Sequence, residues 1–204
     1  MAYLSENTLE RIESAVRAAE SKSRCEIVAV FAARSDDYQY IPLLWAALGA
    51  LLLPAAVVTG FGLRMPVVDY TLVQAVLFAA TAILFRMGEL RVRLVPPKVR
   101  RRRAERMVGL QFVSMGLNSA EAPPAVLFFV SFDERYVRIL TNAKVPVPDE
   151  KWQKIVDTMI ARIRAGELDR GMVEAVETVG TVLKESCPSA EAGDDRLPNR
   201  LILL

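Results

Sequence analysis

One uninterrupted apolar segment limits what this chain can fold into. Ile41 to Leu63 is 23 residues long and contains no ionisable side chain. At about 1.5 Å per residue, a helix of this length covers the roughly 30 Å hydrocarbon core of a bilayer. A second segment, Tyr70 to Phe85, is also uncharged and reaches spanning length if Val67 and Val68 join it. The sequence therefore predicts a transmembrane helical hairpin, with two buried helices of a soluble protein as the alternative.

Basic residues are concentrated directly after the second apolar segment. Between Arg86 and Arg106 there are nine Lys or Arg and two Glu, although the whole chain has a net charge of only +2. Because Lys and Arg near membrane spans mark the cytoplasmic side, we expect both termini in the cytoplasm and only the turn from Arg64 to Asp69 outside. The predicted location is a bacterial inner (cytoplasmic) membrane. The 40 polar, mixed residues before the first span argue against a cleaved signal peptide.

Polar and aromatic side chains near the spans have expected roles of their own. Thr71, Gln74 and Thr81 interrupt the second span and are available for contacts between helices. Tyr38, Tyr40 and Trp45 stand where an interfacial aromatic belt is expected.

The residues on either side of the hairpin show helix and strand patterns. Before it, Ser5 caps a predicted helix, and Glu26 to Ala33 predicts a buried strand whose partners must come from beyond the hairpin. The rest of the chain predicts a basic helix, an antiparallel strand pair and two amphipathic helices. These segments are Lys98–Met115, Ala125–Ser131, Tyr136–Thr141, and helices that begin at Asp149 and near Asp169. The apolar side of the basic helix is marked by Ala104, Val108, Phe112 and Met115. Their order predicts an α/β domain split by the hairpin.

Residue chemistry narrows the functions that this domain can have. Histidine is absent, which removes the usual general base near neutral pH, so any catalysis would rest on carboxylates. Cys25 and Cys187 belong to no metal-type or redox-type cluster, and we interpret them as small buried residues. The adjacent acids Asp36 and Asp37 could bind a cation, although such loop carboxylates are more often simply solvated.

The arginine run has three possible interpretations. Arg100, Arg101, Arg102 and Arg103 would lie at the level of lipid headgroups, where each cation contributes about 1 kcal/mol near an anionic leaflet. A topology signal without specific lipid binding is an equal alternative. Nucleic acid is not expected as a partner, because no aromatic or nucleic-acid motif accompanies the arginines.

Several segments together resemble the membrane-integrated branch of the TPM domain family. They are LERIESAVRAAESKSRCEIVAVFAARSDDY, QFVSMGLN, the strand pair VLFFVSFDERYVRIL followed by AKVP and a tryptophan, and the closing DDRLPN. The family takes its name from a thylakoid photosystem II repair protein, its cyanobacterial relative and a nematode receptor auxiliary protein. The resemblance implies a mixed sheet flanked by helices. For some relatives it implies weak acid phosphatase activity with divalent-cation binding, and for others an auxiliary or assembly role in a membrane complex.

With that resemblance the expected organisation has three parts. Residues 1–40 are the first part of a cytoplasmic TPM-like domain, residues 41–90 the transmembrane hairpin, and residues 91–204 a basic juxtamembrane helix with the remainder of the domain.

The acidic residues that the family would use are depleted in this chain. Where the family has an acid and a glycine before its AKVP-like segment, this chain has Thr141, Asn142 and Ala143. Arg196 and Asn199 replace two further acids near the C-terminus, and Cys25 replaces a glycine. The matching acids that remain are Glu26, Glu134, Asp194 and Asp195. Glu134 is most simply a turn residue, so Glu26, Asp194 and Asp195 are the expected ligands if a divalent cation binds.

The leading hypothesis is a non-catalytic, membrane-anchored accessory or assembly protein of a larger integral-membrane complex. No phosphate-binding glycine loop accompanies the depleted acids, so no catalytic residue and no cofactor are predicted. The alternative is a metal-dependent phosphatase at the membrane surface with weak acid phosphatase activity. A third hypothesis is an anionic-lipid sensor that uses Arg100 to Arg103.

Overall fold

The computed structural model describes residues 4–86, 95–188 and 201–204. The chain divides into two compact units. We call them the α/β domain, which comprises Met1–Ser35 and Arg101–Leu204, and the hairpin unit, which comprises Asp36–Arg100.

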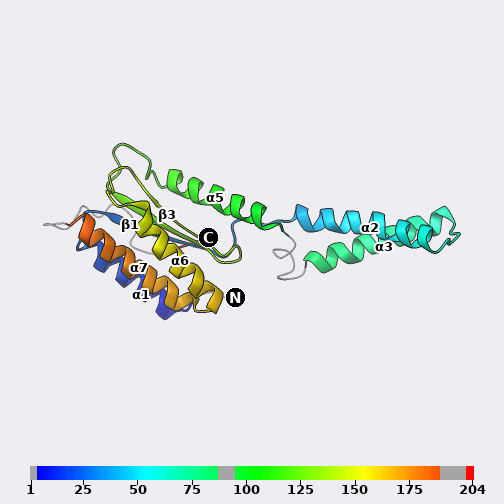
Figure 1. The fold of residues 1–204 in the computed structure, drawn as a ribbon, viewed down its shortest axis with the longest axis horizontal. Helices are drawn as coiled ribbons and strands as arrows, with labels where there is room; N and C mark the ends of the chain where they lie inside the picture. The colour runs from blue at the N-terminus through cyan, green and yellow to red at the C-terminus, as the bar shows by residue number, and fades with distance from the viewer. Residues whose placement is uncertain (1–3, 87–94, 189–200) are drawn as a thin grey trace. The chain divides into compact units, whose positions relative to one another are not determined.

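A four-stranded mixed sheet forms the centre of the α/β domain (Figure 1). Its strands lie in the order β3-β2-β1-β4. Strand β1 (Glu26–Ala32) runs parallel to β2 (Ala125–Ser131) and to the two-residue edge strand β4 (Ile202–Leu203). Strand β3 (Tyr136–Thr141) pairs antiparallel with β2. Every residue of β1 and β2 is buried, as the near-continuous apolar sequence of β1 predicts for a strand covered on both faces.

The sheet confirms the fold class expected from the sequence. The partner of β1 does come from beyond the hairpin, since Glu26 aligns with Ala125 and Ala32 with Ser131. The antiparallel pair β2–β3 has the predicted bounds and its four-residue connection. Strand β4 was not predicted, because a strand of two residues is too short to show a periodic sequence pattern.

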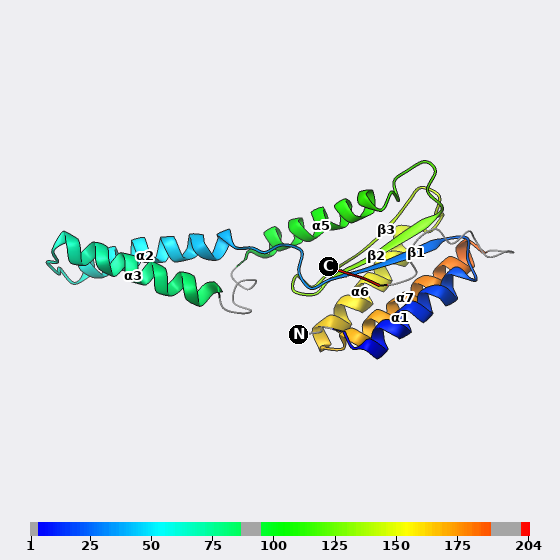
Figure 2. The same cartoon turned by 180° about the vertical axis from the view of Figure 1, so that it is seen from behind.

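Three helices cover one face of the sheet: α1 (Glu6–Glu20), α6 (Asp149–Ala165) and α7 (Leu168–Ser186) (Figure 2). Ser5 caps α1 by accepting a hydrogen bond from the Thr8 amide at 3.2 Å. Helix α6 ends at Gly166, whose φ of 78° is the left-handed conformation that glycine adopts without strain. The buried core on this face comes from alternate strand residues and from the apolar stripes of the helices, among them Ile12, Val16, Ile27, Phe31, Phe128, Trp152, Met159, Met172 and Leu183.

Helix α5 (Pro97–Ser114) covers the opposite face of the sheet. Ala104 and Val108 are buried, and Phe112 and Met115 pack partly against the same cluster. These four residues are the apolar side predicted from the sequence. The domain therefore has three layers, and the basic segment of the chain lies on α5, the single helix of its layer.

The hairpin unit contains two long apolar helices, α2 (Tyr40–Gly60) and α3 (Val67–Arg86), which pack on each other. Both are long and apolar enough to cross a membrane. Helix α3 begins at Val67, as spanning length requires, whereas α2 ends three residues before the predicted Leu63. Gly62, with φ of 64°, lies in the turn between them.

The contact face of α2 is made of small residues. Ala46, Ala50 and Pro54 are buried at a spacing of four, which lets a neighbouring helix approach closely. Of the expected aromatic belt, Tyr40 and Trp45 are about half exposed. Tyr38 is instead fully buried in a small cluster with Ile41 and Val95.

Candidate functional site

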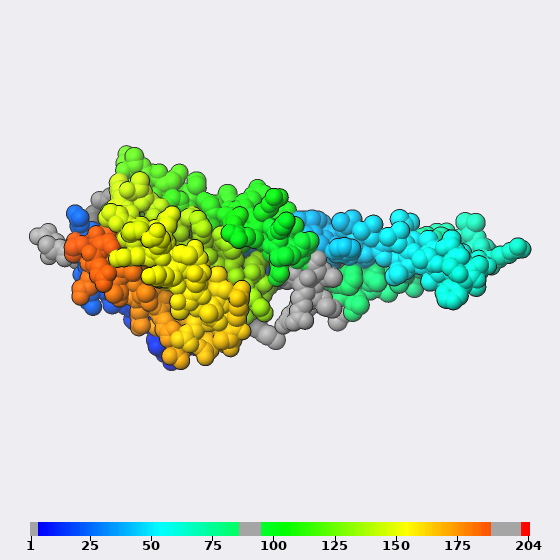
Figure 3. Space-filling model, in the orientation of Figure 1, coloured from blue at the N-terminus to red at the C-terminus, as the bar shows by residue number. Residues whose placement is uncertain are grey.

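The outer face of α5 is the most strongly charged surface that the sequence singled out. Arg101 and Arg102 are exposed, whereas Arg100 and Arg103 are half-buried. Arg101 donates from Nε to Glu105 Oε1 at 2.9 Å, and this hydrogen bond raises the pKa of Arg101. Figure 3 shows the outer surface of this helix in green. The four predicted arginines therefore divide into an exposed pair and a pair that lies closer to the protein.

A polar cluster joins the carboxyl ends of the two central parallel strands, where ligands of open α/β sheets commonly bind. The hydroxyls of Ser35 and Ser131 are 2.7 Å apart. The Glu134 carboxylate accepts from the Ser35 amide at 3.0 Å and from the Ser131 hydroxyl. Ser131 has no exposed surface, so its hydroxyl is not presented to a substrate. The cluster fixes the end of β1 to the β2–β3 turn.

Glu134 thus does more than the predicted turn residue. It joins segments 99 residues apart in the chain, which no local pattern could reveal. The serines gave no signal either, because each is an ordinary residue at the end of a strand.

The opposite edge of the sheet holds Glu26 together with Asn142, which lies in the segment where the resemblance led us to expect an acid. Glu26 is buried at the start of β1, and its amide donates to Pro124 O at 2.9 Å. Asn142 accepts from the Ala125 amide at 3.3 Å and donates to Pro123 O at 2.6 Å. Its amide therefore holds the loop before β2 in place.

A lysine ammonium completes this edge. Lys144 Nζ donates to the carbonyl oxygens of Ala120, at 2.8 Å, and of Ala122. Backbone carbonyls that converge in this way are also typical ligands of hard cations. At this edge the Lys144 ammonium supplies the positive charge that a bound cation would otherwise bring to these carbonyls.

The expected cation ligands are only partly placed. Glu26 lies at the amino end of β1, and Asp194 and Asp195 fall outside the described residues. Among the residues described, no three His, Cys, Asp or Glu side chains gather as a metal ion would require. The three-residue cation site stays a prediction.

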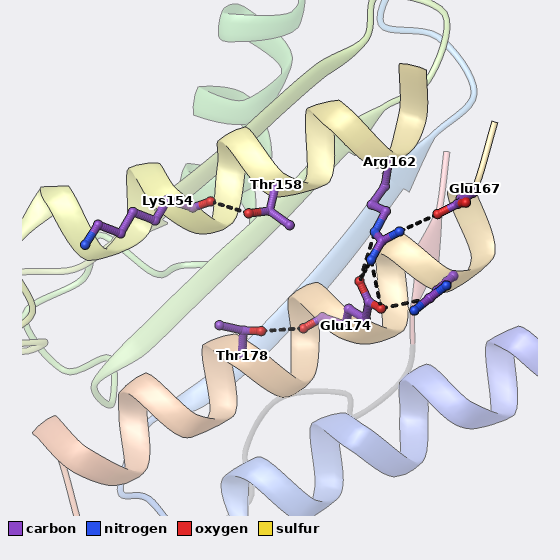
Figure 4. A network of polar contacts seen from close by, with 7 residues as sticks. Lys154, Thr158, Arg162, Glu167, Glu174 and Thr178 are labelled. Carbon is purple, nitrogen blue, oxygen red and sulfur yellow. Dashed lines mark hydrogen bonds and ion pairs between the residues drawn. The ribbon is translucent and has the colours of Figure 1, made fainter. Parts of the chain in front are cut away.

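Helices α6 and α7 carry an ionic network on their outer surface (Figure 4). Arg162 reaches Glu167 and, at 3.0 Å, Glu174, which also accepts from Arg170 at 2.8 Å. The hydrogen bond from Arg170, with the charge of Arg162, lowers the pKa of Glu174. A shallow groove of about 280 Å³ beside it is lined by Lys154, Thr158, Gly171, Glu174 and Thr178 among others. Because the groove is open and the charges beside it are paired, we interpret the network as a contact that joins α6 to α7.

The two cysteines are buried, as expected, and they are also neighbours. The Arg24 amide donates to Cys187 O at 3.1 Å, which brings the end of α7 to the start of β1. Burial, with the adjacent Cys187 thiol, raises the pKa of Cys25 to about 12. The Cys25 thiol is therefore protonated and unreactive near neutral pH.

The polar residues of α3 bond mainly within their own helix. The hydroxyls of Thr71 and Thr81 donate to the carbonyls of Val67 and Leu77 at 2.8 and 2.7 Å. Gln74 Nε2 donates to the Tyr70 hydroxyl at 3.4 Å. Of these three polar residues, Gln74 forms a hydrogen bond to another side chain, whereas the two threonines bond to the backbone.

Comparison with known proteins agrees with this architecture. The solved NMR structure of the BA42 protein from the psychrophilic bacterium Bizionia argentinensis matches with a TM-score of 0.55. The two chains are 15% identical, and the match covers 98% of this chain and 94% of that chain, so the likeness shows a shared fold. Comparison with curated proteins gives no match. The family model described as the TPM domain matches residues 89–182, which places a TPM domain match in the part of the chain that follows its two apolar helices.

Proposed function

We propose that this protein is a membrane-anchored, non-catalytic accessory subunit that binds or stabilises a larger integral-membrane complex. The hairpin unit is its anchor in the bacterial inner membrane, and the TPM-like domain and both termini are cytoplasmic. The divalent cation and the enzymatic activity of some TPM relatives are not part of this proposal.

The observation that carries the proposal is the apolar outer surface of the hairpin. No described residue of α3 is buried, and Leu72, Val76 and Ile83 are 62% to 64% exposed. Exposing this much apolar surface to water is unfavourable by about 25 cal/mol per Å². Lipid or the apolar surface of another membrane protein removes that cost.

The polar groups of the domain support an accessory role more than a catalytic one. The Ser131 hydroxyl is enclosed, the Asn142 amide holds the loop before β2, and the Lys144 ammonium is bound by carbonyls. Each of these three groups, which a catalytic site could recruit, already performs a structural task.

Purification of the tagged protein from its native membranes in mild detergent tests the proposal. We expect a reproducible, stoichiometric set of membrane subunits to co-elute. Two matched double variants localise the contact: Leu72→Ala with Val76→Ala on α3, and Leu51→Ala with Leu52→Ala on α2, all of them exposed residues. We expect the double variant on the helix that contacts the complex to lose the co-eluting subunits, and the double variant on the other helix to keep them.

Two outcomes count against this function. Elution of the protein alone contradicts an accessory subunit. If, in addition, a divalent cation raised the melting temperature and Glu26→Gln removed that shift, the metal-dependent phosphatase alternative would be supported. Topology is tested separately with Met65→Cys, which a membrane-impermeant thiol reagent should label from outside the cell, and with the cytoplasmic control Thr181→Cys, which it should not.

A further inference from the structure

We propose that the outer face of α5 is a lipid-binding surface that lies along the anionic cytoplasmic leaflet. This inference rests on the proposed membrane anchoring and adds a second membrane contact, made by the α/β domain itself. It changes the expected headgroup site from Arg100–Arg103 to a surface centred on Arg102, Arg106, Leu110 and Val113, which we call the α5 outer face.

The α5 outer face follows from the helical period. Arg102, Arg106, Gly109 and Val113 are spaced by four, three and four residues, and all are exposed. They therefore form one line along the helix, opposite the buried pair Ala104 and Val108. Arg100 and Arg103 are half-buried and lie outside this line.

The line has a cationic half and an apolar half. Arg102 and Arg106 occupy the first half, and the exposed acid nearby, Glu105, already pairs with Arg101. In the second half Val113 lies on the line and Leu110 lies to one side of it, and each is 58% exposed. Arginines with long aliphatic stems beside exposed aliphatic side chains are typical of helices that lie in the membrane interface.

The lengths of the chain connections limit how far the α/β domain can move from the hairpin. Residues 87–96 join α3 to α5, and residues 33–39 join β1 to α2. Even fully extended, these connections reach at most about 35 Å and about 25 Å. If the hairpin spans the membrane, the domain is tethered twice and cannot leave the surface.

Tethering explains why a small surface is sufficient. Two exposed aliphatic side chains and two exposed cations would bind a membrane weakly on their own. The hairpin raises the effective concentration of lipid at the domain, so that weak contacts become occupied without further affinity. Charge complementarity selects phospholipid headgroups of net negative charge as the occupant.

The experiment places an environment-sensitive NBD fluorophore on the full chain in lipid nanodiscs. Val113→Cys reports the α5 outer face, Thr181→Cys an exposed site on α7, and Val76→Cys the hairpin. The native thiols can stay, because both are buried and the pKa of Cys25 is about 12. Brominated phospholipids quench only a fluorophore that touches the bilayer.

In bilayers that contain phosphatidylglycerol, we expect the Val113 probe to be quenched at least about twofold more than the Thr181 probe. Adding Arg102→Glu and Arg106→Glu, or replacing the anionic lipid by phosphatidylcholine, should reduce quenching at Val113 and leave Val76 unchanged. Quenching at Val113 no greater than at Thr181, or unaffected by the charge reversals, would overturn the inference. If the Val76 probe were not quenched, the proposed membrane anchor itself would fail, so the two failures are distinguishable.

Discussion

The α/β domain buries its large apolar side chains, whereas the hairpin unit exposes many of them. In the domain, β1 and β2 are enclosed on both faces, and every residue of these strands is buried. In the hairpin, small residues such as Ala46 and Ala50 lie inside, and large ones such as Leu52 and Val76 lie outside. The exposed apolar surface of the hairpin fits lipid better than water, which is the environment that the proposed anchoring would give it.

The largest difference is expected from the same truncation made in each unit. Phe128 is fully buried, whereas Phe78 is 40% exposed. Phe128→Ala should lower the free energy of unfolding by about 3–5 kcal/mol, because it leaves a cavity in the core. Phe78→Ala should cost less than about 1 kcal/mol, since detergent or lipid fills the space. Unfolding of the full chain in mild detergent measures both values, and equal losses would erase the distinction between the two units.

A charge on the outer surface of the hairpin should have the next largest effect. Val76 lies near the middle of α3, so Val76→Arg should make membrane insertion less favourable by about 2.5–3.5 kcal/mol. Thr181→Arg, on the exposed side of α7, should change nothing. The measurement is the fraction of protein that resists carbonate extraction from membranes. Full resistance of Val76→Arg would mean that this face of α3 does not meet lipid.

Two glycine substitutions compare how closely helices pack in the two units. An alanine Cβ at Gly180 would lie 2.5 Å from Ala19 Cβ, so Gly180→Ala should destabilise the domain by about 1–3 kcal/mol. At Gly49 the atom nearest to such a Cβ is Leu53 Cδ1, at 4.0 Å. Gly49→Ala should therefore be tolerated, with a gain of up to about 1 kcal/mol from helix propensity. Melting temperatures of the two variants decide the matter; a stable Gly180→Ala variant would show that α1 and α7 can separate.

The smallest effect is a pH dependence confined to the domain. Arg170 and Arg162 lower the pKa of Glu174 below its usual 4.5, so the folded state favours the ionised carboxylate. That stabilisation is present above the ordinary pKa and is lost as the pH falls through the lowered value. The melting temperature of Glu174→Gln should fall less on acidification than that of the natural chain, whereas Glu185→Gln, at an exposed pair with Lys151, should follow the natural chain. Identical profiles for all three proteins would contradict a role for this network.

Local patterns were sufficient for most of the fold. The β2–β3 pair has the bounds expected from its sequence, and helices α5, α6 and α7 begin within one residue of the expected positions. Apolar periodicity, turn residues and caps specify such elements without reference to distant residues. The spacing of Ala104, Val108, Phe112 and Met115 also identified the buried side of α5.

Features that depend on distant contacts could not be predicted. The Ser35–Ser131–Glu134 cluster joins positions nearly a hundred residues apart. The contact between the Cys25 and Cys187 segments depends on where α7 ends relative to β1. The family resemblance pointed to Glu26 as a possible ligand, but only the structure shows Asn142 and Lys144 occupied with the neighbouring loop.

The position of the hairpin within the sheet also determines the order in which the protein can be made. Strand β1 is synthesised first, and its neighbour β2 follows only after both apolar helices and α5. At translation rates of about 5–20 residues per second, the roughly 90 intervening residues take about 5–20 s. During that time the seven residues of β1, six of them apolar, have no β2 strand to pair with, while the helices that follow them leave the ribosome. The β1–β2 pair, which is central to the sheet, can therefore form only after both apolar helices have been synthesised, and β1 waits unpaired until then.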